Sequence, residues 1–178
     1  MVITIDGPAS SGKSSVGLLL ALKINFQFID SGLIYRIATH LALKKQIDLK
    51  DEERCVQLLK SAQISFKTID GQARASLDGE DVTDLLKTPE IDKAVPIVAA
   101  LPTLREEAKK IQREIGLRQN TVIAGRDIGA EIFPESPLKF FITASLKARA
   151  KRRFDQQVKL HPELTLEVVE EEMKKRDE

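Results

Sequence analysis

Short apolar runs alternate with helix-period segments over the first 43 residues of the chain. Apolar residues at 2–5 and 26–29 predict two buried strands, and the segments 14–23 and 33–43 carry helical patterns. A strand followed by a helix and then by another strand is typical of βαβ units, whose strands lie parallel. The pattern therefore predicts an α/β fold built on a parallel sheet.

The pattern changes between residues 64 and 88. Segments 64–68 and 74–77 predict short strands on either side of an Asp-Gly turn at 70–71, and a second Asp-Gly turn follows at 78–79. These features favour a small antiparallel insertion into the α/β domain. Beyond the insertion, the sequence predicts helices at 102–116, 146–154 and 166–176 and strands at 121–124 and 138–142.

Composition narrows the class of protein without identifying it. The 178 residues suffice for one compact domain, and a hydrophobic fraction of 42% is ordinary for a globular chain. A net charge of +1 with only 4% aromatic residues gives little support to nucleic-acid binding. We expect no signal peptide and no membrane span, and hence a cytoplasmic protein, because the chain opens directly on a strand and carries no apolar run near 20 residues.

The histidines and the cysteine offer no metal site or disulfide. Cys55 is the single cysteine, so neither an intrachain disulfide nor a cysteine-based zinc site can form. We interpret Cys55 as a small buried thiol in a helix, and His40 and His161 as structural or surface residues.

A phosphate-binding motif follows the first predicted strand. The pattern G-x-x-x-x-G-K-[ST] is typical of a P-loop, in which backbone N–H groups and a helix N-terminus point at phosphate oxygens. The lysine reaches the outer phosphates, and the hydroxyl after it is a ligand for Mg²⁺. The predicted ATP-binding residues are Gly7, Pro8, Ala9, Ser10, Ser11, Gly12, Lys13, Ser14 and Ser15.

Three arginines stand at the apparent ends of elements and suit a kinase better than another P-loop class. Phosphoryl transfer depends on positioning and on neutralising spread negative charge, which Arg36, Arg105 and Arg126 can provide. Arg126 directly follows a predicted strand, where α/β sheets place their ligands. The chain also lacks the DxxG and NKxD elements of GTPases.

Several motifs, in a fixed order along the chain, carry a resemblance to a known family. They are the segment 3–9 with the P-loop, Asp30-Ser31-Gly32-Leu33-Ile34-Tyr35-Arg36, the segment 78–83, the segment 98–102 with Arg105, Ala124-Gly125-Arg126-Asp127-Ile128-Gly129, Phe133-Pro134, and the segments 149–153 and 175–177. On these motifs the chain resembles the bacterial-type cytidylate kinases over essentially its whole length.

This resemblance implies a nucleoside-monophosphate-kinase fold, with ATP and Mg²⁺ on the donor side and CMP or dCMP as acceptor. Arg36 and Arg126 are the implied ligands of the acceptor phosphate, and Arg176 joins the CMP-binding set. Ser31, Arg105 and Asp127 are the implied cytosine contacts, and this agrees with the chemistry of the base, because a carboxylate accepts from its N4 amino group. Asp30, just past the second strand, is placed to orient Mg²⁺ together with Ser14.

The same resemblance divides the chain into parts and assigns catalytic roles. Residues 1–60 and 98–178 would form the core domain, with a lid at about 145–162, and residues 61–97 the inserted CMP-binding subdomain. We expect direct in-line transfer without a covalent intermediate, because the acceptor phosphate is already an anion. The expected catalytic residues are Lys13, Arg126, Arg152 and Arg153, and the expected state is a monomer.

Two features leave alternatives open. Cytidylate kinases continue beyond the point that corresponds to Glu178, so we expect weakened acceptor binding and an apolar sheet edge at residues 138–143. A nucleotide-binding fragment without turnover is therefore one alternative, and a kinase for another acceptor, of the AMP, dTMP or shikimate type, is a second. Pro96 and Ala130 also depart from residues common in the family, which affects the details of base recognition and not the reaction class.

Overall fold

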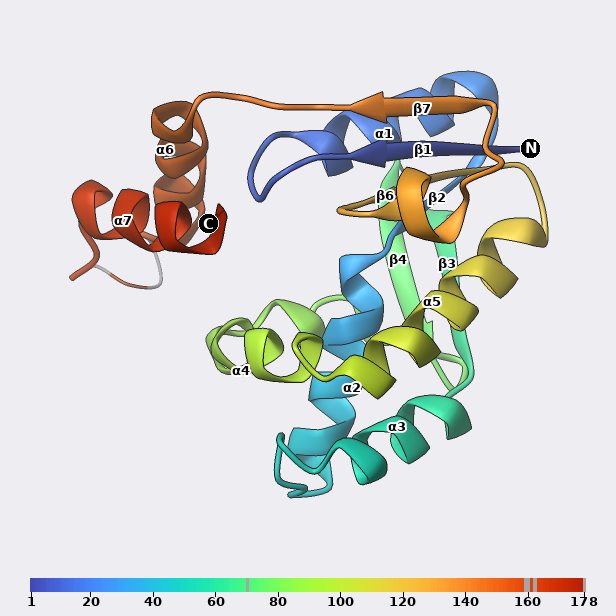
Figure 1. Cartoon of the computed structure of the whole chain (residues 1–178), viewed down its shortest axis with the longest axis horizontal. Helices are drawn as coiled ribbons and strands as arrows, with labels where there is room; N and C mark the ends of the chain where they lie inside the picture. The colour runs from blue at the N-terminus through green and yellow to red at the C-terminus, as the bar shows by residue number, and fades with distance from the viewer. Residues whose placement is uncertain (70, 159–160, 162, 178) are drawn as a thin grey trace.

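A parallel four-stranded sheet forms the centre of the molecule (Figure 1). The computed structural model describes residues 1–69, 71–158, 161 and 163–177, apart from the side chain of residue 176. The sheet has the strand order β2-β6-β1-β7, and all its neighbouring strands run parallel. Its strands are β1 (Val2–Asp6), β2 (Gln27–Asp30), β6 (Thr121–Gly125) and β7 (Leu138–Phe141).

The two faces of this sheet are buried by different helices, as its apolar strands require. One face, with Ile3, Ile5 and Phe28, forms a small core with α1 (Lys13–Ile24). Gly17 in α1 has no room for a side chain, because a Cβ there would lie 2.7 Å from the Phe28 ring. The opposite face, with Ile29 and Ile123, joins a larger core that does not include α1. Residues that alternate along β1, β2 and β6 therefore belong to different cores.

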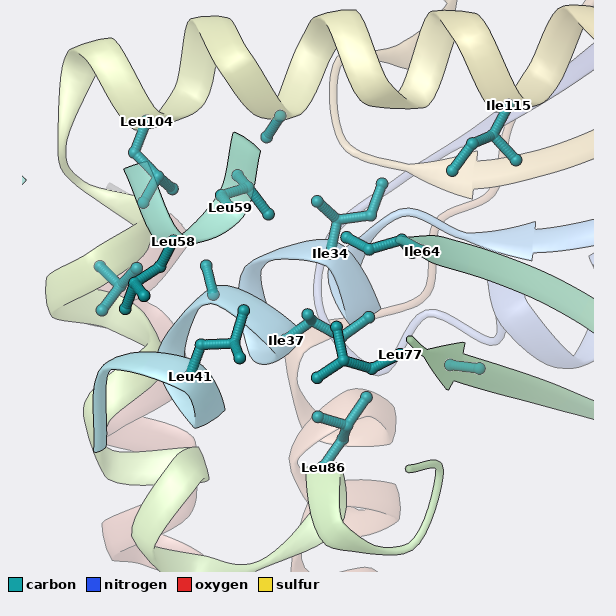
Figure 2. Close-up of a cluster of buried hydrophobic side chains, with 14 of the residues drawn as sticks. Ile34, Ile37, Leu41, Leu58, Leu59, Ile64, Leu77, Leu86, Leu104 and Ile115 are labelled. Carbon is teal, nitrogen blue, oxygen red and sulfur yellow. The ribbon is translucent and has the colours of Figure 1, made fainter. Parts of the chain in front are cut away.

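The larger core is a helical layer built by α2 (Gly32–Lys44), α3 (Glu52–Ser61), α4 (Pro89–Ala99) and α5 (Pro102–Leu117). Leucines and isoleucines from these helices meet the ends of the antiparallel strands (Figure 2). Local signals fix the starts of two helices: the Asp51 side chain accepts from Arg54 N at α3, and the Thr88 side chain accepts from Ile91 N at α4. Pro89 occupies the first turn of α4, where its missing N–H costs nothing.

A separate three-stranded antiparallel sheet contains β3 (Ile64–Ile69), β4 (Gln72–Leu77) and β5 (Glu80–Asp81). Asp78 and Gly79 both have positive φ, 52° and 88°, as a tight hairpin turn between β4 and β5 requires. Phe66 and Leu77 belong to the larger core, and the Gln27 amide donates to the Phe66 carbonyl across 2.6 Å. The antiparallel sheet is thus packed directly against β2.

The last two helices, α6 (Leu146–Gln157) and α7 (Leu166–Asp177), lie beyond the carboxyl ends of β1 and β7 (Figure 1). They pack on each other through Ala150, Val169 and Met173, which form a third apolar cluster. Ala9 of the P-loop packs against the same cluster. The helix pair is therefore joined to the phosphate-binding loop and not to the main core.

The predicted elements are confirmed within one to three residues at most ends, but no range was predicted for α3, for the two-residue strand β5 or for α4. Residues 89–99 form α4, whereas the sequence analysis assigned the whole segment 61–97 to an antiparallel insertion and predicted no helix there. Pro96 inside the segment obscured the helical pattern, although Thr88-Pro89-Glu90 is a clear start signal. The turn at 70–71 falls partly on residue 70, which lies outside the described residues. None of the helices in the described ranges has the length and apolar character needed to cross a bilayer.

The expected apolar sheet edge is present. β7 is the outer strand of the parallel sheet, and Phe140 and Phe141 are 48% and 71% exposed. The strand is shorter than the predicted segment 138–143, because regular pairing with β1 ends at Phe141.

Candidate active site

The P-loop lies between the end of β1 and the start of α1, as the motif predicts. Gly7 cannot carry a side chain, because a Cβ there would lie 2.1 Å from the Ile142 carbonyl oxygen. Gly12 has φ 100° and directly precedes α1, whose first turn receives no side-chain cap. These N-terminal N–H groups and the positive end of the helix dipole form a site for an anion. The Ser11 hydroxyl is buried in the loop without a hydrogen-bond partner.

The residues predicted as magnesium ligands are in direct contact. The Ser14 hydroxyl donates to Asp30 Oδ2 across 2.7 Å, and the other carboxylate oxygen accepts from Gly32 N at 3.0 Å. A hydroxyl and a carboxylate are hard oxygen ligands that suit Mg²⁺, which usually takes few protein ligands beside phosphate and water. Among the described residues no cluster of three or more His, Cys, Asp or Glu side chains could hold a metal. The donor set therefore fits a metal carried in with a nucleotide.

A carboxylate at the end of β1 positions the Gly-Arg-Asp motif. Asp6 accepts from Ile128 N and Gly129 N, both at 2.8 Å, and these N–H groups open the short π-helix η2 (Ile128–Ile132). Arg126 and Asp127 lie between β6 and η2, so their backbone is held at both ends. Sequence reasoning gave Asp6 no role, although its place directly before the P-loop was a usable signal.

Ser31 and Gly125 meet where β2 and β6 end side by side. Ser31 N donates to the Ala124 carbonyl at 3.0 Å, and the Ser31 side chain is buried. A Cβ on Gly125 would lie 2.4 Å from Ser31 Oγ, so only glycine allows this approach. The contact places Ser31 next to the exposed Arg126 and Asp127.

Arg105 reaches the same place from α5. Its guanidinium lies 3.9 Å from Asp127 Oδ2 and also donates to the Ala99 carbonyl at 3.4 Å. One helical turn further along, Lys109 pairs with Glu131 of η2 at 2.6 Å. Hydrogen bonds to Glu131 and Glu106 raise the pKa of Lys109 to about 12, and the hydrogen bond from Lys109 lowers the pKa of Glu131. The structure thus pairs two of the predicted base contacts, Arg105 and Asp127, while the third, Ser31, packs against Gly125, two residues before Asp127.

Arg36 and Arg153 converge on one carboxylate that the sequence analysis did not single out. Arg36 donates from Nη2 to Asp92 Oδ1 at 2.5 Å and from Nη1 to the Leu86 carbonyl at 2.6 Å. Arg153 Nη2 lies 3.5 Å from the other oxygen of Asp92. Asp92 stands in the first turn of α4, the helix that the sequence pattern did not reveal, so no local signal indicated its role.

The basic helix α6 contacts the P-loop through two arginines with different environments. Arg152 Nη1 donates to the carbonyls of Ser10 and Ser11, at 3.2 and 3.0 Å. Arg149 is only 5% exposed, donates to the carbonyls of Ala144 and Ala9, and pairs with Asp177 of α7. Arg152 thus lies at the phosphate site, whereas Arg149 joins α6, α7 and the loop.

The structure assembles most of the predicted site at one edge of the sheet. Lys13 lies in the P-loop and donates to the Pro8 carbonyl at 3.1 Å, and Ser15 lies exposed in the first turn of α1. Arg126 is exposed beside Asp127. Arg176 belongs to α7, but its side chain lies outside the described part of the structure, so its assignment stays a prediction.

The site combines a phosphate-binding loop with an adjoining hydroxyl–carboxylate pair and with arginines from three further elements. This combination defines a P-loop phosphotransferase of the small-molecule kinase class. A family model described as cytidylate kinase matches residues 3–178. The chain belongs to the cytidylate kinase family.

Curated relatives agree with that assignment. Cytidylate kinase of Caldanaerobacter subterraneus subsp. tengcongensis is 44% identical over 98% of this chain and 76% of its own length. Cytidylate kinases of Bacillus licheniformis and Bacillus subtilis are each 39% identical, over 99% and 98% of this chain and 79% and 78% of their own lengths.

Proposed function

We propose that this protein transfers the γ-phosphoryl group of ATP to CMP or dCMP, forming ADP and CDP or dCDP. The observation that supports the proposal is the junction of β2, β6 and α5, where Arg105 lies 3.9 Å from Asp127 and Ser31 packs against Gly125, directly before Arg126. This junction and the P-loop lie at the carboxyl edge of the same parallel sheet, where α/β folds bind their ligands.

The acceptor base is recognised by complementary hydrogen bonds. Asp127 accepts from the N4 amino group of cytosine, while Arg105 and the Ser31 hydroxyl donate to the acceptors O2 and N3. Uracil carries a carbonyl oxygen in place of that amino group, which would face the carboxylate of Asp127. We therefore expect UMP to be the poorer acceptor.

The donor nucleotide binds in the P-loop, whose N–H groups and Lys13 hold its phosphates. Ser14 and Asp30 would hold the Mg²⁺ that accompanies ATP, and the ion would supply positive charge that neutralises the phosphates. Arg152 lies on the P-loop carbonyls of Ser10 and Ser11, so a small side-chain rotation brings its charge to the transferring group.

The transfer itself needs positioning and charge and no protein nucleophile. An oxygen of the acceptor phosphate, already an anion at neutral pH, attacks the γ-phosphorus in line with the leaving β–γ bridging oxygen. Arg126 and Arg36 hold the acceptor phosphate, while Lys13, Arg152 and Arg153 neutralise the charge spread over the transferring group. The helix pair α6–α7 covers the P-loop and excludes water, which would otherwise take the phosphoryl group.

The test is ADP production from ATP and Mg²⁺ with CMP, dCMP, UMP and AMP as parallel acceptors. We expect CMP and dCMP to be used well above the others, and Arg126→Ala to lower kcat/KM by roughly a hundredfold or more. Arg118→Ala is the matched control, because Arg118 directly follows α5 and, in the described part of the structure, forms an exposed ion pair with Glu114.

Two outcomes would contradict the proposal. ATP binding without turnover would make this chain a nucleotide-holding module, the alternative that the family match does not favour. Preference for AMP would assign a different acceptor. The monomeric state, the cytoplasmic location and the division at residues 61–97 stay predictions.

A further inference from the structure

Asp92 gathers two arginines that come from different parts of the fold. Arg36 belongs to α2 and lies in the predicted acceptor site, Arg153 belongs to the lid helix α6, and Asp92 belongs to α4. Both carboxylate oxygens are used: Oδ1 lies 2.5 Å from Arg36 and Oδ2 lies 3.5 Å from Arg153. The three side chains are each about one quarter exposed, so the cluster is accessible to a ligand.

The two arginines of this cluster are arranged as in a phosphate-binding site, with the Asp92 carboxylate at the position of the phosphate. Two guanidinium groups facing one anion with two oxygens is the arrangement in which arginines bind phosphate. The cluster has two positive charges and one negative charge, so it attracts a further anion. An acceptor phosphate carries about two negative charges at neutral pH and would be repelled by Asp92 at the same position.

We propose that Asp92 is a stand-in for the acceptor phosphate: it holds Arg36 and Arg153 together in the free enzyme and competes with CMP for them. Asp92 is a positioning residue, since it acts through the two arginines. The inference rests on the proposed function, because it takes Arg36 as a ligand of the acceptor phosphate. It goes beyond that function by giving α4 a regulatory contact with the lid.

Exchange of the two anions explains how acceptor binding is signalled to α6. When a phosphate replaces Asp92 on Arg36, the contact between Arg153 and Asp92 weakens as well, because the phosphate attracts both arginines. The lid helix is then attached to the bound acceptor and not to α4. Lid closure over the P-loop and filling of the acceptor site become linked through a single carboxylate.

The test compares Asp92→Asn with Glu90→Gln in calorimetric titrations with CMP and with cytidine, without ATP. Glu90 is the matched control, because it is an exposed carboxylate in the same first turn of α4 and pairs with neither arginine. We expect Asp92→Asn to bind CMP roughly two- to fivefold more tightly, as the loss of one competing surface-accessible pair predicts. Cytidine lacks the phosphate, so its affinity should not change, and Asp92→Glu should restore the wild-type value for CMP.

Steady-state kinetics supply a second measurement, which would not change if Asp92 had only a structural role. The KM for CMP should fall in Asp92→Asn by a larger factor than any change in kcat, while the KM for ATP stays constant. Unchanged or weaker CMP binding in Asp92→Asn, or equal tightening in Glu90→Gln, overturns the inference. If wild type makes no CDP but Asp92→Asn still tightens CMP binding, the proposed function fails and this inference stands.

Discussion

Replacing Asp6 by asparagine tests whether one carboxylate positions the acceptor site. Asp6 accepts two backbone hydrogen bonds at 2.8 Å, from Ile128 and Gly129. Asparagine keeps one acceptor oxygen and turns an NH₂ group towards the other N–H, so one charge-assisted bond is lost and a donor faces a donor. A hydrogen bond to a charged group contributes about 1.5–3 kcal/mol, and we expect the free energy of unfolding to fall by about 2 kcal/mol.

Urea denaturation and the ADP assay together check this expectation. A loss of about 2 kcal/mol corresponds to a Tm lower by roughly 4–8 °C for a chain of this size. Because Arg126 and Asp127 are held through η2, kcat/KM for CMP should also fall, by roughly tenfold or more. The matched control is Asp48→Asn. Its carboxylate accepts an exposed hydrogen bond from Lys50 N at 2.9 Å, so the substitution should change neither Tm nor kcat/KM much.

An Asp6→Asn variant with wild-type urea midpoint and wild-type kcat/KM would refute the reasoning. A variant that loses stability but keeps full activity would show that Asp6 supports the fold without positioning Arg126. Nucleotide binding to the P-loop can be followed separately, since ATP affinity should change less than CMP turnover.

Three further outcomes are expected. Arg149→Met should destabilise the packing of α6 on α7 by about 3 kcal/mol, because it breaks a buried charged contact. Limited proteolysis between the two helices should then be faster in this variant and unchanged in the exposed control Lys147→Met. Burial and the charge of Lys44 lower the pKa of His40, so the unfolded chain binds more protons and stability should rise between about pH 5 and pH 7; His40→Gln should flatten that slope in urea titrations, and an unchanged slope would contradict it. Phe141→Lys on the exposed edge strand should reduce concentration-dependent light scattering with little change in Tm, whereas equal scattering would show that β7 is not the associating edge.

Local motifs carried most of what the sequence could predict. The P-loop depends on glycines and a helix start within eight residues, so its fold and its contact with the following helix were readable from the pattern. Strands β1, β2 and β6 were equally clear, because both of their faces are buried and their residues are correspondingly apolar.

Contacts between distant segments could not be predicted in the same way. Asp92 lies 56 residues from Arg36 along the chain, and a carboxylate in the first turn of a helix is ordinarily explained by the helix dipole alone. Arg149 and Arg152 are three residues apart in one basic stretch, and only the packing of α6 on the loop shows that Arg149 is buried against α7 whereas Arg152 lies on the P-loop carbonyls. Such differences arise from tertiary packing, which sequence periodicity does not encode.

The close approach at Gly7 gives the lid a fixed point of attachment. The backbone of Ile142, which leads from β7 towards α6, donates to the Asp6 carbonyl at 2.8 Å and fills the space where a side chain of residue 7 would lie. The segment therefore leaves the sheet in contact with the P-loop, and it links this loop directly to the proposed lid helix α6. We expect a displacement of that loop to reach α6 directly through this backbone contact, by a route separate from the contact between Arg153 and Asp92.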